Sequence, residues 1–196
     1  MSRAAVFLDR DGTVCREVGY VNHPSRLELM PDAGASIRRL NAAGLAVVIA
    51  TNQAGIARGY FPEHVLHETH ERLRTLLSAE GARLDGIYAC VHHPDTGGPG
   101  FQRDCECRKP KPGLLLQAAG DLDLDLSQSA MVGDSFRDVG AGRNAGVAHT
   151  VMLRTGYGQG ELLWKSAQAS AWPDRIADTL EAAVTWILAQ RAEEHR

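Results

Sequence analysis

The sequence predicts an α/β protein with a doubly wound parallel sheet of the Rossmann-like type. First, short apolar runs alternate along the chain with longer segments whose apolar residues recur at helical spacing. Second, the apolar runs are continuous, as expected for strands that helices cover on both faces. Third, small polar or charged residues directly follow several of these runs. Right-handed crossovers would bring those strand ends together at one edge of the sheet.

The elements follow one another in a regular order. The segments predicted to be strands are 5–8, 45–50, 86–89, 129–132 and 149–153. The segments predicted to be helices are 31–43, 62–80, 113–119, 138–145 and 173–190. The remaining longer stretches are predicted to be loops or connectors: 14–30, 90–107, 121–126 and the glycine-rich 156–160.

Length and composition favour a single domain over residues 1–196, with the loop 90–107 inserted in it. A chain of 196 residues can bury a substantial core but is short for two domains. A net charge of -3 gives no reason to expect nucleic acid as a partner. The apolar run before Asp9 is too short for a signal peptide, and no later run reaches membrane-spanning length. We therefore expect a cytoplasmic, monomeric protein without a membrane partner.

Acidic and polar side chains gather at the predicted strand ends. They are Asp9 and Asp11 after the first strand, Thr51 and Asn52 after the second, and Asp134 and Asp138 after the fourth. Carboxylates pressed together repel one another, so we expect a divalent cation among them, and oxygen ligands favour Mg²⁺. With Lys109 and Thr51 nearby, such a site suits a phosphoryl group. One carboxylate could attack phosphorus while the other protonates the leaving oxygen.

A second group of candidate metal ligands lies in the loop 90–107. Its three thiols and one imidazole come in two pairs, Cys90 with His92 and Cys105 with Cys107. This is the donor set of a closed tetrahedral zinc site, so we expect a structural Zn²⁺ that staples the loop. His93 could replace His92 as the fourth ligand. Because Arg108 and Lys109 directly follow the last cysteine, zinc would also fix where these two cations point.

The strand-end motifs resemble those of the haloacid dehalogenase superfamily of phosphatases. The motifs are Asp9-Arg10-Asp11-Gly12-Thr13, Thr51-Asn52, Lys109-Pro110, and Gly133-Asp134 followed by Asp138. The resemblance implies that Asp9 is the nucleophile, that Asp11 is the general acid/base, and that Thr51 and Lys109 stabilise the phosphoryl group. It implies Mg²⁺ bound by Asp9, Asp134 and the backbone carbonyl of Asp11, with Asp138 orienting these ligands. The implied fold has the zinc-stapled loop and no separate cap domain.

Within this superfamily the chain resembles the heptose-bisphosphate phosphatases, on the zinc loop and on the stretch 52–61. The resemblance implies removal of the 7-phosphate from D-glycero-D-manno-heptose 1,7-bisphosphate, a step toward surface glycans. The implied substrate contacts come from the loop after the first strand, the end of the second strand, and the third and fourth motifs. They are Glu17, Val18, Gly19, Tyr20, Asn52, Gln53, Ala54, Arg58, Arg108 and Ser135.

Two other functions remain open at this point. Histidinol-phosphate phosphatases share the four motifs and the zinc loop, so those features do not separate the two substrates. Arg58 favours the sugar bisphosphate, because a cation suits a second phosphate better than the cationic amine of histidinol phosphate. The chain could also be a zinc-loop interaction module without catalysis, although the four motifs are intact. The anomer of the sugar phosphate is left undecided by the sequence.

Overall fold

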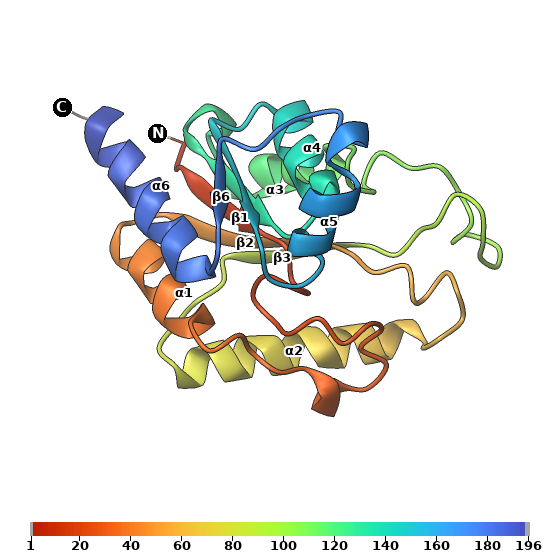
Figure 1. Cartoon of the computed structure of the whole chain (residues 1–196). Helices are drawn as coiled ribbons and strands as arrows, with labels where there is room; N and C mark the ends of the chain where they lie inside the picture. Colours follow the sequence, from red (N-terminus) through yellow and green to blue (C-terminus); the bar gives the residue numbers. More distant parts are fainter. Residues whose placement is uncertain (1, 195–196) are drawn as a thin grey trace.

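The computed structural model describes residues 2–194 and arranges their strands in one six-stranded parallel sheet (Figure 1). The strand order is β3-β2-β1-β4-β5-β6. β1 (Ala5–Leu8) therefore lies between β2 (Ala46–Asn52) and β4 (Ala130–Gly133). From β1 the chain first adds β2 and β3 on one side and then adds β4, β5 and β6 on the other. The carboxyl end of β1 is thus the topological switch point, where open α/β sheets bind their ligands.

The other elements complete the alternation of strands and helices. The remaining strands are β3 (Gly86–Cys90), β5 (His149–Leu153) and β6 (Arg175–Ala177). The α-helices are α1 (Ala33–Ala42), α2 (Glu63–Ala79), α3 (Gly113–Leu122), α4 (Phe136–Ala145), α5 (Gly158–Trp164) and α6 (Leu180–Glu194). Short 3-10 turns cover Pro24–Arg26, Leu126–Gln128 and Ser166–Gln168. Within residues 2–194, no helix combines the length and apolar character needed to cross a bilayer.

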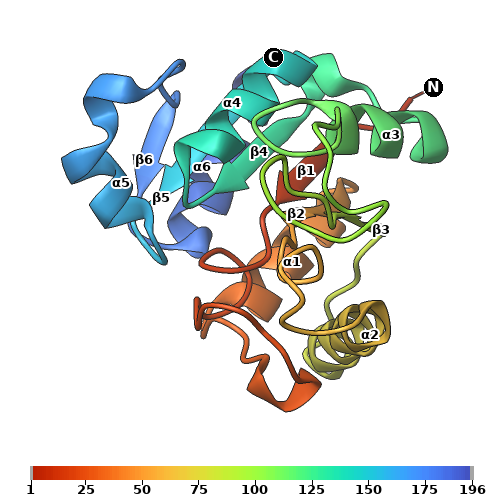
Figure 2. The same ribbon diagram turned by 90° about the vertical axis from the view of Figure 1, so that its right-hand side faces the viewer.

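Helices cover both faces of the sheet (Figures 1 and 2). Val6 and Leu8 of β1 pack with residues of α1, α2 and α6 on one face. Ala5 and Phe7 point the other way and pack with residues of α3 and α4. Because successive side chains of a strand point to opposite faces, a strand covered twice is apolar at every position. This explains the continuous apolar runs, and the predicted doubly wound parallel sheet is confirmed.

The predicted strands are confirmed to within two residues at each end, but the helix predicted at 173–190 is partly wrong. Residues Arg175–Ala177 instead form β6, an edge strand that pairs with β5. Asp174 holds this segment in place, because its carboxylate accepts hydrogen bonds from Thr150 N at 2.7 Å and from Arg143 Nη2 at 2.6 Å. The helix α6 begins only at Leu180.

The prediction of a loop over the glycine-rich stretch 156–160 is also partly wrong, since α5 begins at Gly158. Two of its glycines allow backbone segments to approach closely. A Cβ atom at Gly156, where φ is +54°, would overlap the carboxylate of Asp134, and one at Gly158 would overlap the carbonyl oxygen of Leu153. The glycines therefore let α5 start directly against the ends of β4 and β5.

Candidate active site

The segments that follow β1, β2 and β4 line one pocket at the carboxyl edge of the sheet, the edge that faces the viewer in Figure 2. Its volume is about 330 Å³. Most of the residues predicted for the site line it: Asp9, Asp11, Glu17, Gly19, Tyr20, Thr51, Asn52, Gln53, Ala54, Arg108, Lys109, Asp134 and Ser135. The topology thus brings together residues from four separate stretches of sequence, as the strand-end argument predicted.

Three carboxylates and one buried ammonium meet in this pocket. Oxygens of Asp9, Asp134 and Asp138 lie within 4.8 Å of one another. The Nζ atom of Lys109 lies 2.9 Å from Asp9 Oδ1 and 2.6 Å from Asp138 Oδ1, and it donates to the carbonyl oxygen of Ala50 at 2.6 Å. Burial alone would lower the pKa of Lys109, but the carboxylates of Asp138 and Asp9 outweigh burial and raise it. Lys109 is therefore a cation.

One lysine does not balance three acids. Burial and the charges of Asp9 and Asp138 raise the pKa of Asp134 to about 8. Burial also raises the pKa of Asp138 to about 6, although Lys109 opposes the shift. Asp138 already uses both oxygens, since Oδ1 faces Lys109 and Oδ2 accepts from Ser135 N at 3.0 Å. The surplus of carboxylate oxygens fits a hard divalent cation such as Mg²⁺, with Asp9 and Asp134 as the better placed ligands.

We expect Mg²⁺ to stabilise the folded protein, and to do so more strongly at pH 8 than at pH 6. In the metal-free protein, the folded state holds protons on Asp134 and Asp138 that the unfolded state has released, because their pKa values are raised above 3.8. These two groups therefore lower the free energy of unfolding as the pH rises from 3.8 toward about 8. A bound cation takes the place of the protons, so its stabilising effect grows over the same range.

The quantity to measure is the difference in melting temperature with and without Mg²⁺ at each pH. Groups far from the site titrate alike with and without Mg²⁺, so their contribution to the melting temperature cancels in this difference. Asp134→Asn is the matched variant, since it keeps the side-chain shape but removes one ionisable carboxyl group from the cluster. It should show a smaller Mg²⁺ effect at both pH values. An Mg²⁺ effect in the wild type that is equal at pH 6 and pH 8 would contradict the prediction.

The side chain of Asp11 lies beside the carboxylate cluster rather than in it. Its Oδ2 accepts hydrogen bonds from Arg10 Nη2 at 2.8 Å and from Gln53 Nε2 at 2.8 Å. Gln53 Nε2 also lies 2.9 Å from the hydroxyl oxygen of Thr51, which is buried at the end of β2. The two aspartates after β1 therefore have different cationic neighbours, Lys109 for Asp9 and Arg10 for Asp11.

The side chain of Asn52 holds the backbone of Lys109 in position beside the end of β2. Its side-chain amide donates to the carbonyl oxygen of Lys109 at 3.0 Å, and its Oδ1 accepts from the backbone N–H of Lys109 at 3.1 Å. The amide of Asn52 thus bonds both the N–H and the C=O of Lys109, as the backbone of a neighbouring strand would. Asn52 was predicted to contact substrate, and the structure shows that its amide already holds the segment that carries the buried ammonium.

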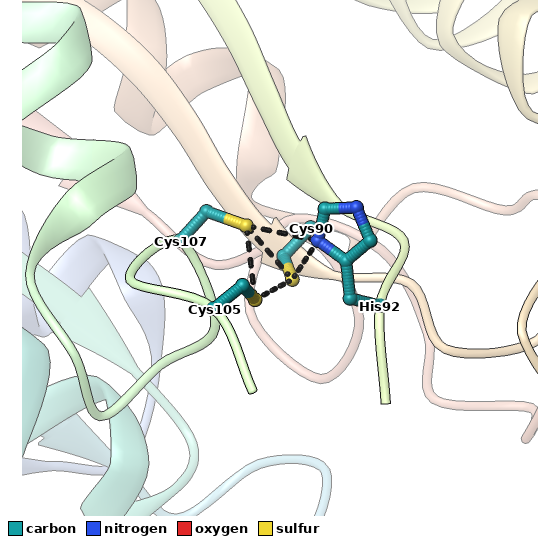
Figure 3. Close-up of side chains that lie close together, drawn as sticks. All are labelled: Cys90, His92, Cys105 and Cys107. Atoms are coloured by element: carbon teal, nitrogen blue, oxygen red, sulfur yellow. Dashed lines mark hydrogen bonds between the residues drawn. The ribbon is translucent and has the colours of Figure 1, made fainter. Parts of the chain in front are cut away.

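The predicted zinc ligands come together after β3 (Figure 3). The Sγ atom of Cys107 lies 3.2 Å from that of Cys90 and 3.3 Å from that of Cys105, and the sulfurs of Cys90 and Cys105 are 3.6 Å apart. Nδ1 of His92 lies 3.3 Å from Cys107 Sγ. Three thiols and an imidazole nitrogen facing one centre fit the closed tetrahedral coordination that Zn²⁺ prefers.

His92 rather than His93 belongs to this cluster. Both ring nitrogens of His93 have other partners, since Nε2 lies 2.9 Å from Arg58 Nη2 and Nδ1 accepts from Asp95 N at 3.2 Å. The cluster also reaches the pocket, because Nη1 of Arg108 donates to the carbonyl oxygen of His92 at 3.1 Å. The loop therefore ties the side chain of a pocket-lining arginine to a cluster residue.

Known proteins match this chain in sequence. A family model described as HAD-hydrolase-like matches residues 106–183. The D-glycero-D-manno-heptose-1,7-bisphosphate 7-phosphatase of Thermosynechococcus vestitus is 45% identical over 194 residues, which cover 95% of this chain and 96% of that one. The chain belongs to the HAD-like heptose-bisphosphate phosphatase family.

Further members of the heptose-bisphosphate phosphatase family agree in sequence and in fold. The D-glycero-beta-D-manno-heptose-1,7-bisphosphate 7-phosphatase of Pasteurella multocida is 43% identical over 154 residues, covering 79% of this chain and 83% of that one. The crystal structure of the D,D-heptose 1,7-bisphosphate phosphatase from B. bronchiseptica, complexed with magnesium and phosphate, superposes with a TM-score of 0.82. It is 34% identical and covers 95% of this chain and 99% of that one. The predicted superfamily is confirmed.

Two residues predicted to contact substrate in this family, Val18 and Arg58, are not among the described residues that line the pocket. The side chain of Val18 packs against the hydrophobic core, as expected for an apolar group that can be withdrawn from water. Arg58 points to the zinc loop, where it contacts His93. The structure therefore does not support the prediction that Arg58 serves a second phosphate, which had separated the sugar bisphosphate from histidinol phosphate.

Further residues that line the pocket were missed from the sequence: Arg137, Tyr157, Glu161 and Lys165. Glu161 is buried and accepts from Ser135 Oγ at 3.2 Å and from Phe136 N at 3.2 Å, and it forms an ion pair with Lys165. A signal was present, because Glu161 and Lys165 stand four residues apart, the spacing of an ion pair on a helix. The helix α5 was not predicted, because the glycine-rich stretch 156–160 is typical of a loop.

Proposed function

We propose that this chain removes the 7-phosphate of D-glycero-D-manno-heptose 1,7-bisphosphate and releases heptose 1-phosphate, for nucleotide-activated heptose and surface glycans. The observation that carries the proposal is the buried ammonium of Lys109 between the carboxylates of Asp9 and Asp138, at the switch point of the sheet. An attacking carboxylate beside a fixed cation meets the needs of phosphoryl transfer. The sugar is inferred from relatives 45% and 43% identical that are named for this substrate.

In the first step, an oxygen of Asp9 attacks phosphorus and the bond between phosphorus and the C7 oxygen breaks. The Asp11 carboxyl gives its proton to the leaving oxygen, so heptose 1-phosphate leaves with a neutral hydroxyl group at C7. The product on the protein is an aspartyl-phosphate at Asp9. Lys109 balances the negative charge of the transferring group, and the hydroxyl of Thr51, which also lines the pocket, holds its oxygens.

In the second step, a water molecule attacks the phosphorus of the aspartyl-phosphate while Asp11, now ionised, accepts a proton from that water. Inorganic phosphate leaves and both aspartates return to their starting states. Asp9, Asp134 and the backbone carbonyl of Asp11 would hold Mg²⁺, and Asp138 would orient Lys109 beside them. The cation would supply charge neutralisation for the phosphoryl oxygens. The magnesium and phosphate bound to the B. bronchiseptica relative support this assignment.

The outer part of the pocket suits a sugar that carries a second phosphate. Three cations besides Lys109 line it: Arg108, Arg137 and Lys165. Glu17 also lines the pocket; its carboxylate accepts from Gly19 N at 2.6 Å, and burial raises its pKa. A carboxylate beside Tyr20 and Ala54 offers acceptors and an apolar surface to sugar hydroxyls. The pocket lining thus includes both anion-binding and sugar-binding groups.

We expect Lys165→Gln to raise KM for the bisphosphate by about 3- to 10-fold and to leave kcat nearly unchanged. Lys165 would contact the phosphate that does not react, so its loss weakens ground state and transition state alike. Steady-state kinetics with the 1,7-bisphosphate and with heptose 7-phosphate measures this effect. The matched control is Lys111→Gln, since Lys111 pairs with Asp104 at 2.8 Å and does not line the pocket. Equal changes in KM for both substrates would contradict the assignment.

The experiment that tests the proposed function is a comparison of phosphate release from three substrates. They are the α and β anomers of the heptose bisphosphate and histidinol phosphate. We expect kcat/KM for at least one heptose anomer to exceed that for histidinol phosphate. Faster turnover of histidinol phosphate would replace the proposed substrate. No turnover of any of the three would favour a non-catalytic zinc-loop module.

The mechanism above assigns all its roles to residues of one chain. We therefore propose that the enzyme acts as a monomer. Sugar phosphates are charged metabolites that stay in the compartment where they are made, so we place the reaction in the cytoplasm.

A further inference from the structure

Arg10, between the two aspartates after β1, has a buried guanidinium to which the mechanism above gives no role. Its side chain is 1% exposed. A permanent cation is costly to bury unless a partner compensates it. The partner is the adjacent Asp11, because Arg10 Nε lies 3.1 Å from Asp11 Oδ1 and Arg10 Nη2 lies 2.8 Å from Asp11 Oδ2. This two-point contact fixes the plane of the carboxylate as well as its position.

Gln53 closes the arrangement. Its Oε1 accepts from Arg10 Nη2 at 2.9 Å, and its Nε2 lies 2.8 Å from Asp11 Oδ2 and 2.9 Å from Thr51 Oγ1. Arginine can only donate, so the carbonyl oxygen of the amide must face Arg10 and the NH₂ group must face Asp11. The chemistry of its neighbours therefore determines the orientation of this amide. Gln53 also lines the pocket, and its role as a direct substrate contact stays a prediction.

We propose that Arg10 and Gln53 are positioning residues that hold the carboxylate of Asp11 where it can exchange a proton with the leaving oxygen and with water. The inference rests on the proposed function, in which Asp11 is the proton shuttle. Lys109 faces the nucleophile Asp9 while Arg10 faces Asp11, so the two aspartates are held by separate cations. Misplacing a catalytic group by about 1 Å can cost up to about 100-fold in rate.

The two steps of the reaction allow this role to be separated from a merely structural one. With p-nitrophenyl phosphate, the leaving nitrophenolate needs no proton, so Asp9 can be phosphorylated without help from Asp11. Hydrolysis of the aspartyl-phosphate still requires Asp11 to take a proton from water. A positioning defect at Asp11 should therefore slow the second step and spare the first. General damage to the pocket would slow both steps.

The variants are Arg10→Met and Gln53→Met, which remove the donors and keep similar side-chain volume. We expect a rapid burst of about one nitrophenolate per active site at the wild-type rate, because the first step is spared. The steady-state rate that follows should fall about 10- to 100-fold. Stopped-flow absorbance measures both phases. Should Arg10→Met fail to fold by circular dichroism, Gln53→Met decides the question, since it leaves the buried charge paired.

Two reference variants complete the experiment. Arg39→Met removes a surface arginine that contacts Thr185 Oγ1 at 2.9 Å, and it should behave as wild type. Asp11→Asn should show the burst with almost no turnover. If Gln53→Met turns over at the wild-type rate while Asp11→Asn does not, or if the burst in Gln53→Met slows as much as the steady state, the positioning role is wrong and the proposed function stands. If Asp11→Asn turns over normally, the proposed function itself is wrong.

Discussion

Asp9→Asn is expected to abolish phosphate release and to leave the fold unchanged. An amide has the shape of the carboxylate but lacks the charged oxygen that attacks phosphorus. The change also removes one of the three acids that lie within 4.8 Å of one another, which relieves repulsion with Asp134 and Asp138. This relief offsets part of the lost ion pair with Lys109. Phosphate release from the bisphosphate measures activity, and circular dichroism with thermal unfolding measures the fold.

The control for this variant is Asp121→Asn on α3. Asp121 accepts a hydrogen bond from the hydroxyl of Tyr88 at 3.2 Å and does not line the pocket. It should release phosphate at the wild-type rate. Turnover by Asp9→Asn comparable to that of the control would sink the covalent mechanism, and the water molecule would then have to attack phosphorus directly.

The second large effect concerns the cluster of Cys90, His92, Cys105 and Cys107. We expect about one zinc per chain, because a closed set of four protein ligands binds one ion tightly. Cys107→Ser should lose the zinc and lower the melting temperature by at least about 5 °C, since 1 kcal/mol corresponds to about 2–4 °C in a domain of this size. Activity should fall as well, because Cys107 is followed directly by Arg108 and Lys109. Elemental analysis, thermal unfolding and phosphate release in excess Mg²⁺ measure the three effects.

Cys15→Ala is the matched variant for this test. Cys15 is the remaining cysteine of the chain and lies buried in the core, outside the cluster. Its replacement should cost some stability through lost packing and keep the zinc content unchanged. A metal content in the wild type far below one zinc per chain, or equal zinc in both variants, would argue against the site. Assaying in excess Mg²⁺ prevents loss of the catalytic cation from being mistaken for loss of zinc.

The sequence was sufficient for the central part of the fold because each strand from β1 to β5 contains a continuous apolar run. β6 was missed because it has three residues, of which Arg175 is exposed, and its pairing depends on Asp174 binding Thr150. That contact joins positions distant in sequence, and no local pattern predicts it. The boundary of a single domain at 1–196 stays a prediction.

The acidic part of the site was predictable for a physical reason. Ligands bind at the carboxyl ends of the strands in open α/β sheets, and the strand order brings the polar residues Asp9, Thr51 and Asp134 to that edge. The directions of individual side chains were not predictable. Val18 and Arg58 stand among pocket residues in the sequence but turn to the core and to His93. Their orientation depends on neighbours from other segments, and a single sequence does not display these.

The central place of β1 also bears on how the chain acquires its structure during synthesis. β1 is made before both of its partners, since it pairs with β2 on one side and β4 on the other, and β4 ends only at residue 133. Until that point has left the ribosome, the apolar strand Ala5–Leu8 has an open edge, and the first carboxylates lack Asp134 and Asp138. A nascent chain therefore carries Asp9 and Asp11 long before the pocket around them is complete. Chaperones that cover exposed strands would act in that interval.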